Sequence, residues 1–219
     1  MAFDNIEKRY AMCSSASESF EFWIYGNRTE VQIRQFFSEE YGGMVWPAAK
    51  TVGAILSANP ERVRGKAVLE LGCGTGLSGI VAAKCGAHVL FTDKRDPPEI
   101  LDNCKENCRL NGLTDYEVIP VQWGEPIPHL PSIDMIIGAD LFYDSKLLDD
   151  LLFTVSYIML HNPQCQLLFA FPYRESVQLL KQYFDRWSLS LLPPVLYEDE
   201  ESETNVMVVS SFEWNESTQ

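Results

Sequence analysis

The sequence predicts an α/β domain in which helices cover both faces of a mostly parallel, doubly wound sheet. Three observations support this prediction. Short apolar runs alternate with helical segments from residue 67 to residue 184, the glycine-rich run Gly72-Cys-Gly-Thr-Gly76 follows the first apolar run, and the last two extended segments are joined too closely for a crossover helix. The first two features are typical of nucleotide-binding sheets, and the third predicts an antiparallel edge.

Five apolar runs are the predicted parallel strands. They are Ala67–Leu71, Ala87–Thr92, Glu117–Val121, Ile133–Gly138 and Gln166–Phe171. Helical composition and capping residues predict the helices between and after them. These helices are expected at Gly79–Cys85, after a cap at Asp96, at Lys146–Leu160 after a cap at Ser145, and near Glu175–Phe184.

The N-terminal region departs from the strand and helix alternation. Residues 1–19 are polar and rich in serine, and we expect a flexible N-terminus there. From Phe20, apolar residues alternate with period two on both sides of Asn27-Arg28, which predicts an N-terminal β-hairpin. Pro47 can then occupy the first turn of a helix.

The C-terminal region also departs from the alternation. Trp187–Tyr197 and Asn205–Trp214 have extended patterns, and a short acidic segment joins them. Strands joined this closely pair antiparallel, so a C-terminal hairpin is expected. Because there is no internal repeat or linker, residues 20–214 are predicted to form a single domain.

Composition and charge restrict the possible partners. The 219 residues carry a net charge of −14, and 46% of them are hydrophobic. A chain without clustered Lys and Arg is a poor ligand for duplex nucleic acid, and no run approaches the ~20 apolar residues that span a bilayer. The acidic charge favours a basic protein as partner. We expect a monomer.

The six cysteines indicate a reducing compartment and no metal site. No Cys-x-x-Cys pair occurs, and Cys104 and Cys108, although one helical turn apart, have no His or Cys nearby to complete a metal-binding set. We interpret the cysteines as buried apolar side chains, and expect a cytoplasmic and nuclear protein.

The glycine-rich run predicts a nucleotide-like ligand. Closely spaced glycines allow the backbone to turn sharply and to approach a ligand without Cβ clashes. Gly74, Gly76 and Gly79 also fit the dinucleotide pattern Gly-x-Gly-x-x-Gly, with Asp93 at a suitable distance for a ribose-binding acid. The glycines alone therefore leave both a dinucleotide and S-adenosylmethionine possible.

Two acids at strand ends add to this site. Glu70 ends the first predicted strand, where a carboxylate can face the ammonium group of a methionine moiety; alternatively, it caps a helix. Asp93 ends the second strand, where its oxygens suit a ribose diol; alternatively, it is a surface acid of a turn.

The chain resembles a known family in four places. These are VLELGCGTGLSGI, the upstream Gly-Met-Val-Trp46-Pro-Ala-Ala, Val121-Gln-Trp123-Gly and Ala139-Asp140-Leu-Phe-Tyr143. Together they resemble the seven-β-strand, Rossmann-like methyltransferases of family 16, over about residues 20–213. The resemblance implies S-adenosylmethionine as the cofactor. With the two acids and the glycine-rich run above, the predicted cofactor-binding residues are Trp46, Glu70, Gly72, Cys73, Gly74, Gly76, Asp93, Trp123 and Ala139.

The resemblance implies an acceptor site at the motif Asp-x-x-Tyr, here Asp140 and Tyr143. Methyl transfer from a sulfonium ion is an in-line displacement, so positioning of the acceptor supplies much of the rate. Asp140 would orient a cationic acceptor but would also favour its charged form, whereas an aromatic wall that includes Tyr143 would oppose that charge. We therefore assign Asp140 to orientation.

Three functions remain compatible with the sequence. The first is methylation of a basic protein side chain, the second a cofactor-binding scaffold or chaperone partner, and the third, disfavoured by the C-terminal hairpin, an NAD-dependent oxidoreductase. Most family members methylate lysine, but the run AAKCGA resembles a branch associated with histone arginine. Arginine favours a pair of carboxylates, which Asp140 with Asp144 or with Glu39-Glu40 could supply. We favour arginine, in a basic protein such as a histone.

Overall fold

The structure is a computed structural model of the chain. It describes residues 7–15, 18–25, 29–37, 41–172, 177–191, 195–198 and 203–211, and side chains over 29–37, 41–172 and 180–190. None of the helices in these ranges is long and apolar enough to cross a bilayer.

A large sheet forms the centre of the molecule, with the strand order β10-β11-β8-β7-β4-β5-β6, and β9 also pairs with β11. Strands β4 to β8 pair parallel, whereas β11 runs antiparallel to β8, β9 and β10. The bounds are β4 Ala67–Leu71, β5 His88–Asp93, β6 Tyr116–Pro120, β7 Met135–Ala139, β8 Gln166–Pro172, β9 Leu189–Leu191, β10 Val195–Glu198 and β11 Glu203–Ser211. The predicted α/β fold with a parallel sheet is confirmed.

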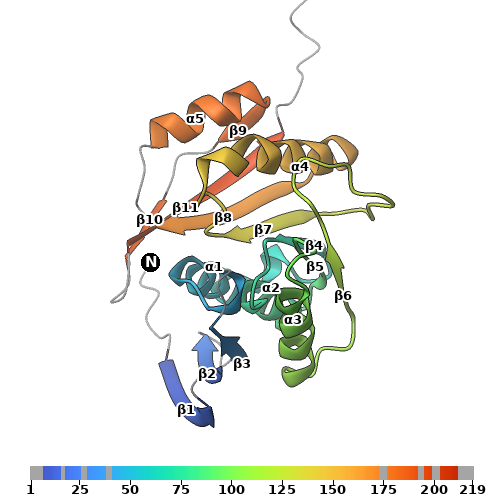
Figure 1. The fold of residues 1–219 in the computed structure, drawn as a ribbon. Helices are drawn as coiled ribbons and strands as arrows, with labels where there is room; N and C mark the ends of the chain where they lie inside the picture. Colours follow the sequence, from blue (N-terminus) through green and yellow to red (C-terminus); the bar gives the residue numbers. More distant parts are fainter. Residues whose placement is uncertain are drawn as a thin grey trace, which may run out of the picture.

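Helices cover both faces of this sheet (Figure 1). On one face lie α1 Pro47–Ala58, α2 Leu77–Lys84 and α3 Pro98–Leu110, and on the other lie α4 Leu148–His161 and α5 Val177–Arg186. Alternate residues of β4 enter different cores: Val68 packs with α1, α2 and α3, while Leu69 and Leu71 pack with α4. This is the burial on both faces that apolar runs in parallel strands predict.

A second, smaller sheet lies beneath the helices α1 to α3 (Figure 1). It consists of β1 Glu7–Ser15, β2 Glu18–Tyr25 and β3 Thr29–Phe36, paired antiparallel in that order. Val31 and Ile33 of β3 are buried against the main core. The predicted turn at Asn27-Arg28 lies outside the described residues. Strand β1 was not expected from the sequence, and the flexibility of residues 1–19 remains a prediction.

The C-terminal segment differs in detail from the expected single extended run. Two short strands, β9 and β10, replace it, and both pair with β11. The large sheet therefore has eight strands, one more than the family resemblance implies. The residues that join β9 to β10 and β10 to β11 lie outside the described part of the chain.

Two of the predicted helix caps are wrong. Helix α3 begins at Pro98 after Pro97, whose extended backbone takes the capping position without a side-chain hydrogen bond, so Asp96 lies one residue too early. Before α4, Ser145 opens a short 3₁₀ helix that is capped instead by Asp144, whose Oδ1 accepts a hydrogen bond from Lys146 N at 2.9 Å.

Candidate active site

A cavity of about 420 Å³ lies at the carboxyl ends of β4, β5, β6 and β7. This edge of a parallel sheet is where ligands bind in such folds, and the volume suits a small-molecule ligand. Loops after the four strands form one side, and the segment before α1 forms the other. The lining residues include Tyr41, Gly42, Met44, Trp46, Glu70, Gly72–Thr75, Asp93, Lys94, Ile100, Val121–Trp123, Ala139–Leu141 and Tyr143.

The glycine-rich loop after β4 brings backbone directly to the cavity. Gly72 and Gly74 have φ values of +59° and +52°, in the left-handed region that favours glycine. A Cβ at Gly74 would lie 3.2 Å from the carbonyl oxygen of Gly42 on the opposite wall. The backbone conformation therefore favours glycine at both positions, and at Gly74 the closeness of the opposite wall does so as well.

Gly76 has a different place from the other glycines of the run. It does not line the cavity but precedes α2, with a φ of +81°. A Cβ there would lie 2.9 Å from Cys104 Sγ. Packing against α3 thus accounts for this glycine.

Cys73 lines the cavity, but its thiol is not expected to act as a nucleophile. A hydrogen bond with Cys104 favours its thiolate, but burial has the opposite effect, and the pKa of Cys73 is raised to about 12. Only a thiolate is a good nucleophile. Like Cys85, Cys104, Cys108 and Cys165, it is a buried free thiol, as the sequence predicts for these five.

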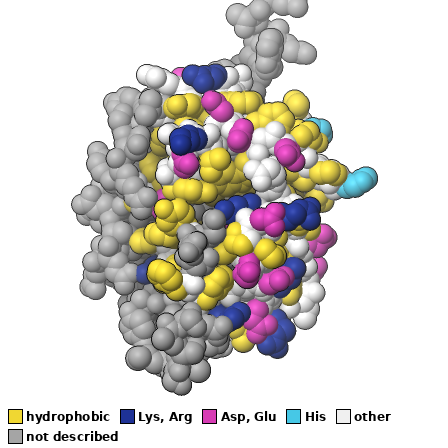
Figure 2. Space-filling model, viewed as in Figure 1, with side chains coloured by type: hydrophobic (Ala, Val, Ile, Leu, Met, Phe, Trp, Pro, Cys, Tyr) yellow, Lys and Arg dark blue, Asp and Glu magenta, His cyan; other side chains and the backbone are white. Residues whose placement is uncertain are grey.

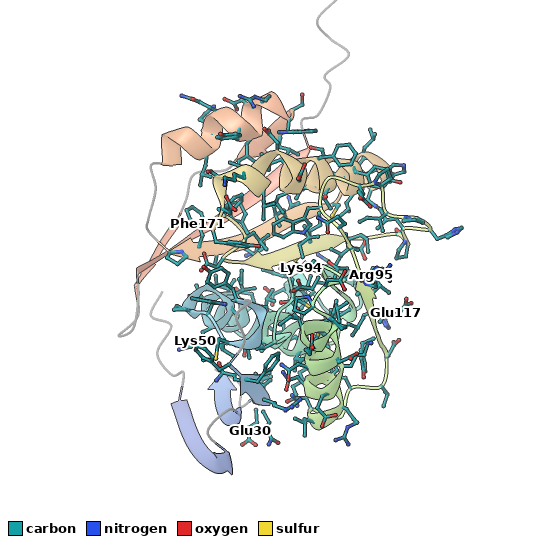
Figure 3. The ribbon with its side chains drawn as sticks, in the orientation of Figure 1. Glu30, Lys50, Lys94, Arg95, Glu117 and Phe171 are labelled. Carbon is teal, nitrogen blue, oxygen red and sulfur yellow. The ribbon has the colours of Figure 1, made fainter. Side chains whose placement is uncertain are left out.

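The carboxylate of Asp93 stabilises the loop at the end of β5. Its Oδ2 accepts a hydrogen bond from Gly74 N, and its Oδ1 accepts one from Lys94 N, both at 2.8 Å. Burial raises the pKa of Asp93, and the two backbone hydrogen bonds oppose that rise. Each carboxylate oxygen can accept a further hydrogen bond, so the group can also bind a diol. Lys94, which directly follows Asp93, is labelled near the centre of the molecule in Figure 3.

Glu70 lies beneath the glycine-rich loop and is only 2% exposed. Its Oε2 accepts a hydrogen bond from Gly79 N, in the first turn of α2, at 3.1 Å. Glu70 therefore accepts a hydrogen bond from a free N–H group at the start of α2, as the helix-capping interpretation of the sequence predicts. It also lines the cavity. Burial raises the pKa of Glu70 to about 8.

Glu70 is expected to make the stability of the ligand-free protein fall as pH rises. Its pKa is about 8 in the folded chain and 4.5 ordinarily. Between these values the folded state binds more protons than the unfolded state, so the free energy of unfolding decreases with pH, by at most about 1.4 kcal/mol per pH unit. Urea unfolding between pH 5 and pH 8 measures this. Glu70→Gln should show a flatter profile; parallel profiles for the two proteins would contradict the assignment.

An aromatic cluster stands over the cavity. The Tyr41 ring centroid lies 6.0 Å from that of Trp46 and 5.8 Å from that of Tyr143, and Trp46 Nε1 donates a hydrogen bond to the Tyr41 carbonyl at 2.9 Å. Tyr41 and Tyr143 are 65% and 47% exposed, so this cluster forms the outer rim. Trp123 also lines the cavity and packs against the core beside α4.

Asp140 occupies the turn after β7. It has a φ of +54°, and its backbone N donates a hydrogen bond to the Ala170 carbonyl of β8 at 2.8 Å. Asp144 does not line the cavity, and the Asp144 side chain caps the 3₁₀ helix instead. Glu39-Glu40 lies outside the described residues. Among the described residues, the carboxylates that line the cavity are therefore those of Glu70, Asp93 and Asp140.

Several lining residues were not predicted from the sequence. Tyr41, Gly42 and Met44 come from the segment before α1, Ile100 from α3, and Gln122 from the loop after β6. Gln122 lies between two residues of a motif already singled out, which could have indicated it; no local pattern marks the others. Within the described residues, no group of three or more His, Cys, Asp or Glu side chains is placed to hold a metal ion.

Comparison with known families bears on this cavity. The model of a family described as "Lysine methyltransferase", methyltransferase family 16, matches residues 26–189. The chain belongs to this family. It is thus an S-adenosylmethionine-dependent protein methyltransferase, and the oxidoreductase alternative is set aside.

Individual relatives agree with the family. METTL23 of Xenopus laevis, named a histone-arginine methyltransferase, is 35% identical over 74% of this chain and 70% of that protein. METTL21A of Xenopus tropicalis, named a protein N-lysine methyltransferase, is 32% identical over 65% of this chain and 66% of that protein. A 16S rRNA methyltransferase (RsmC) of T. thermophilus, solved with AdoMet and guanosine, superposes with a TM-score of 0.66 at 17% identity, over 90% of this chain and 51% of that one, which supports the fold alone.

The cavity fits S-adenosylmethionine chemically. Gly72, Cys73 and Gly74 of the glycine-rich loop line the cavity, and the two glycines present no side chain there, so the loop backbone can approach a ligand. Asp93 offers acceptors for a diol, and aromatic and aliphatic side chains suit the face of a base and a sulfonium ion. When bound, the cofactor supplies a methyl group on a sulfonium centre.

Proposed function

We propose that this methyltransferase acts on a basic side chain of a protein, with Asp140 and Tyr143 at the acceptor side. The observation that carries this proposal is the composition of the cavity. The glycine-rich loop, Asp93 and the half-buried Asp140 line the cavity, and the exposed Tyr41 and Tyr143 lie at its rim. A cationic side chain entering at the rim meets one carboxylate and a wall of aromatic rings.

We further propose which residues contact the cofactor. The backbone of the glycine-rich loop approaches it, Asp93 accepts hydrogen bonds from the ribose, and Glu70 faces the ammonium group. Rings and small side chains surround the remaining parts of the ligand. The proposed set is Trp46, Glu70, Gly72, Cys73, Gly74, Asp93, Trp123 and Ala139, all of which line the cavity; Gly76 acts on the shape of the loop.

At the acceptor side, the chain has two opposing effects on a basic nitrogen. The Asp140 carboxylate attracts and orients the cation, and so favours the protonated form. Aromatic rings beside the nitrogen are less polar than water and so favour its neutral form, which carries the lone pair needed for attack. Because Asp140 is half-buried rather than fully enclosed, we assign it to orientation of the acceptor rather than to proton removal.

Arginine in a histone is the acceptor that we propose first. It is supported by the METTL23 relative, which is named a histone-arginine methyltransferase and is similar over three quarters of the chain. A net charge of −14 also favours a basic protein. On the face in Figure 2, acidic side chains are interspersed with basic ones, so the attraction is diffuse and should weaken as salt rises.

Lysine is the second candidate, and a specific observation favours it. Among the described carboxylates that line the cavity, Asp140 is the one that follows β7 in the motif with Tyr143, whereas Glu70 and Asp93 bind backbone N–H groups around the glycine-rich loop, and Asp144 caps a helix outside the lining. One orienting acid with aromatic walls suits an ammonium group, whereas a guanidinium is best bound by paired acceptors. The family description and the METTL21A relative point the same way.

Matched histone peptides decide between the two acceptors. Each Lys or Arg is replaced in turn, and transfer is detected by mass. We expect methylation that disappears with one arginine replacement. Methylation that survives every arginine replacement and disappears with a lysine replacement would select the second candidate. Transfer to a whole-cell extract but to no histone peptide would discard the histone.

Asp140→Ala is expected to reduce single-turnover methyl transfer by about tenfold or more, because a charge-assisted contact to the acceptor is lost. Cofactor affinity should change little, and Tyr143→Phe should follow the same pattern with a smaller effect. Asp102→Ala, on the exposed surface of α3, is the matched control and should leave both quantities unchanged. If Asp140→Ala turns over like the parent, the alternative of a cofactor-binding scaffold or chaperone partner is favoured instead.

We also propose that residues 20–214 act as one domain, as a monomer, in the cytoplasm and nucleus. The buried packing of β3 against α1 to α3 supports a single domain. The five buried free thiols support a reducing compartment.

A further inference from the structure

The free edge of β3 is paired with the side chains of a helix. Strand β3 lies at the edge of the small sheet, and α3 lies against it (Figure 1). Gln32 N donates a hydrogen bond to Asn111 Oδ1 at 2.9 Å, and Asn111 Nδ2 donates one back to the Gln32 carbonyl at 2.6 Å. Arg34 lies two residues further along β3 and is bound in the same way by Asn107. Arg34 N donates a hydrogen bond to Asn107 Oδ1 at 2.8 Å, and Asn107 Nδ2 donates one to the Arg34 carbonyl at 3.1 Å.

The repeat distances of a helix and a strand explain this arrangement. Four residues of an α-helix rise about 6 Å, and two residues of a strand rise about 6.6 Å. Asn107 near the end of α3 and Asn111 directly after it lie four residues apart, and can therefore meet alternate residues of β3. Asn103, one turn before Asn107, does not reach a further residue of the strand: its Nδ2 also donates to the Arg34 carbonyl, at 3.2 Å. We call these three asparagines the amide ladder.

Asn107 differs from the other members of the ladder because it also binds the glycine-rich loop. Asn107 Nδ2 donates a second hydrogen bond, to the carbonyl of Thr75 at 2.8 Å. The side chain is completely buried, and both of its donor hydrogens have acceptors. A single side-chain amide thus joins β3 to the loop that lines the cavity.

Strand β3 in turn supports the opposite wall of the cavity. Gln35, which is 3% exposed, accepts a hydrogen bond from Val45 N at its Oε1, at 2.5 Å. Val45 directly precedes Trp46, and the same short segment carries Tyr41 and Met44 into the cavity lining. Asn107 is therefore linked to both walls, directly to the loop and through β3 to the aromatic segment.

We propose that Asn107 is a positioning residue that couples the small N-terminal sheet to the cofactor loop, so that cofactor binding and attachment of β3 strengthen each other. This rests on the proposed placement of S-adenosylmethionine in the cavity. A ligand that contacts both walls binds most tightly when the two walls have the correct separation. By linkage, the bound ligand then stabilises the contacts that set this separation.

The test compares the same substitution at two positions of the ladder. Asn107→Asp keeps an acceptor for Arg34 N but loses the donors to the Arg34 and Thr75 carbonyls. Asn111→Asp loses the equivalent donors, including the one to Gln32, but does not touch the loop. We expect Asn107→Asp to weaken S-adenosylmethionine binding by about tenfold, whereas Asn111→Asp stays within about twofold of the parent. At saturating cofactor, kcat of Asn107→Asp should fall less than cofactor affinity.

Hydrogen exchange on the parent protein provides a measurement that needs no variant. Cofactor should slow exchange of the Gln32 and Arg34 amides, which donate to the ladder, as well as exchange in the loop. In Asn107→Asp, or in Asn107→Ala if the first variant does not fold, protection should remain in the loop and be lost from β3. Equal affinity losses at positions 107 and 111, or a β3 that does not respond to cofactor in the parent, would overturn the proposal. If the parent fails to bind S-adenosylmethionine, the proposed site itself is wrong.

Discussion

Asp93→Asn is expected to weaken S-adenosylmethionine binding by about 10- to 150-fold, which corresponds to ~1.5–3 kcal/mol for a hydrogen bond to a charged group. Both oxygens of the Asp93 carboxylate already accept backbone hydrogen bonds, from Gly74 N and from Lys94 N. An asparagine has only one acceptor oxygen, and its amino group would face one of these donors. The substitution therefore disturbs the loop as well as the proposed ribose contact. Calorimetric titration with S-adenosylmethionine measures the loss.

A second carboxylate near the same strand serves as the control. Asp115 is exposed and pairs with His88 at 2.6 Å, away from the cavity. Asp115→Asn should leave cofactor affinity unchanged, because Asp115 is exposed and neither it nor His88 lines the cavity. If Asp93→Asn binds the cofactor as tightly as the parent, Asp93 has only a structural role in its turn, which is the alternative that the sequence left open.

The order of strands and helices could be predicted because each parallel strand is an apolar run between turn residues. Caps were less predictable, since Asp96 and Ser145 both satisfy the local pattern for a helix start. At α3, Pro97 holds the capping position in an extended conformation, and before α4 the neighbouring Asp144 makes the hydrogen bond. The strand β1 contains many polar and charged residues, so no alternation of apolar and polar side chains predicts that it pairs as a strand.

The candidate site likewise contains residues that could be predicted from the sequence and residues that could not. Glu70 and Asp93 could be proposed from sequence because they lie at or next to the ends of strands, at the ligand edge of the sheet, and Asp140 because its motif resembles that of a known family. The place of Tyr41 in the cavity lining depends on the tertiary position of the segment before α1, which no local pattern marks. Asn107 lies within an ordinary amphipathic helix, and only its tertiary contacts with Arg34 and Thr75 mark it. Interactions between distant segments leave no local pattern.

Gly79→Ala is expected to destabilise the protein by about 1–3 kcal/mol, the usual effect of overpacking a core. Helix propensity alone predicts the opposite sign, since alanine is favoured over glycine inside a helix by about 1 kcal/mol. The difference arises from packing. A Cβ at Gly79 would contact the Phe91 ring and lie 2.5 Å from Glu70 Oε2. Accommodating it would push α2 away from the sheet and lengthen the hydrogen bond that Gly79 N donates to Glu70.

Gly65→Ala separates this packing effect from the general effects of a glycine substitution. Gly65 has a φ of +71° and nothing within 4 Å of its Cβ position, so alanine there introduces backbone strain of about 1–2 kcal/mol without a collision. Urea unfolding of the parent and both variants measures the two effects. Because Glu70 lies under the glycine-rich loop, Gly79→Ala should also lower S-adenosylmethionine affinity, whereas Gly65→Ala should not. A Gly79→Ala protein more stable than the parent would mean that α2 can move without cost, and that helix propensity governs this position.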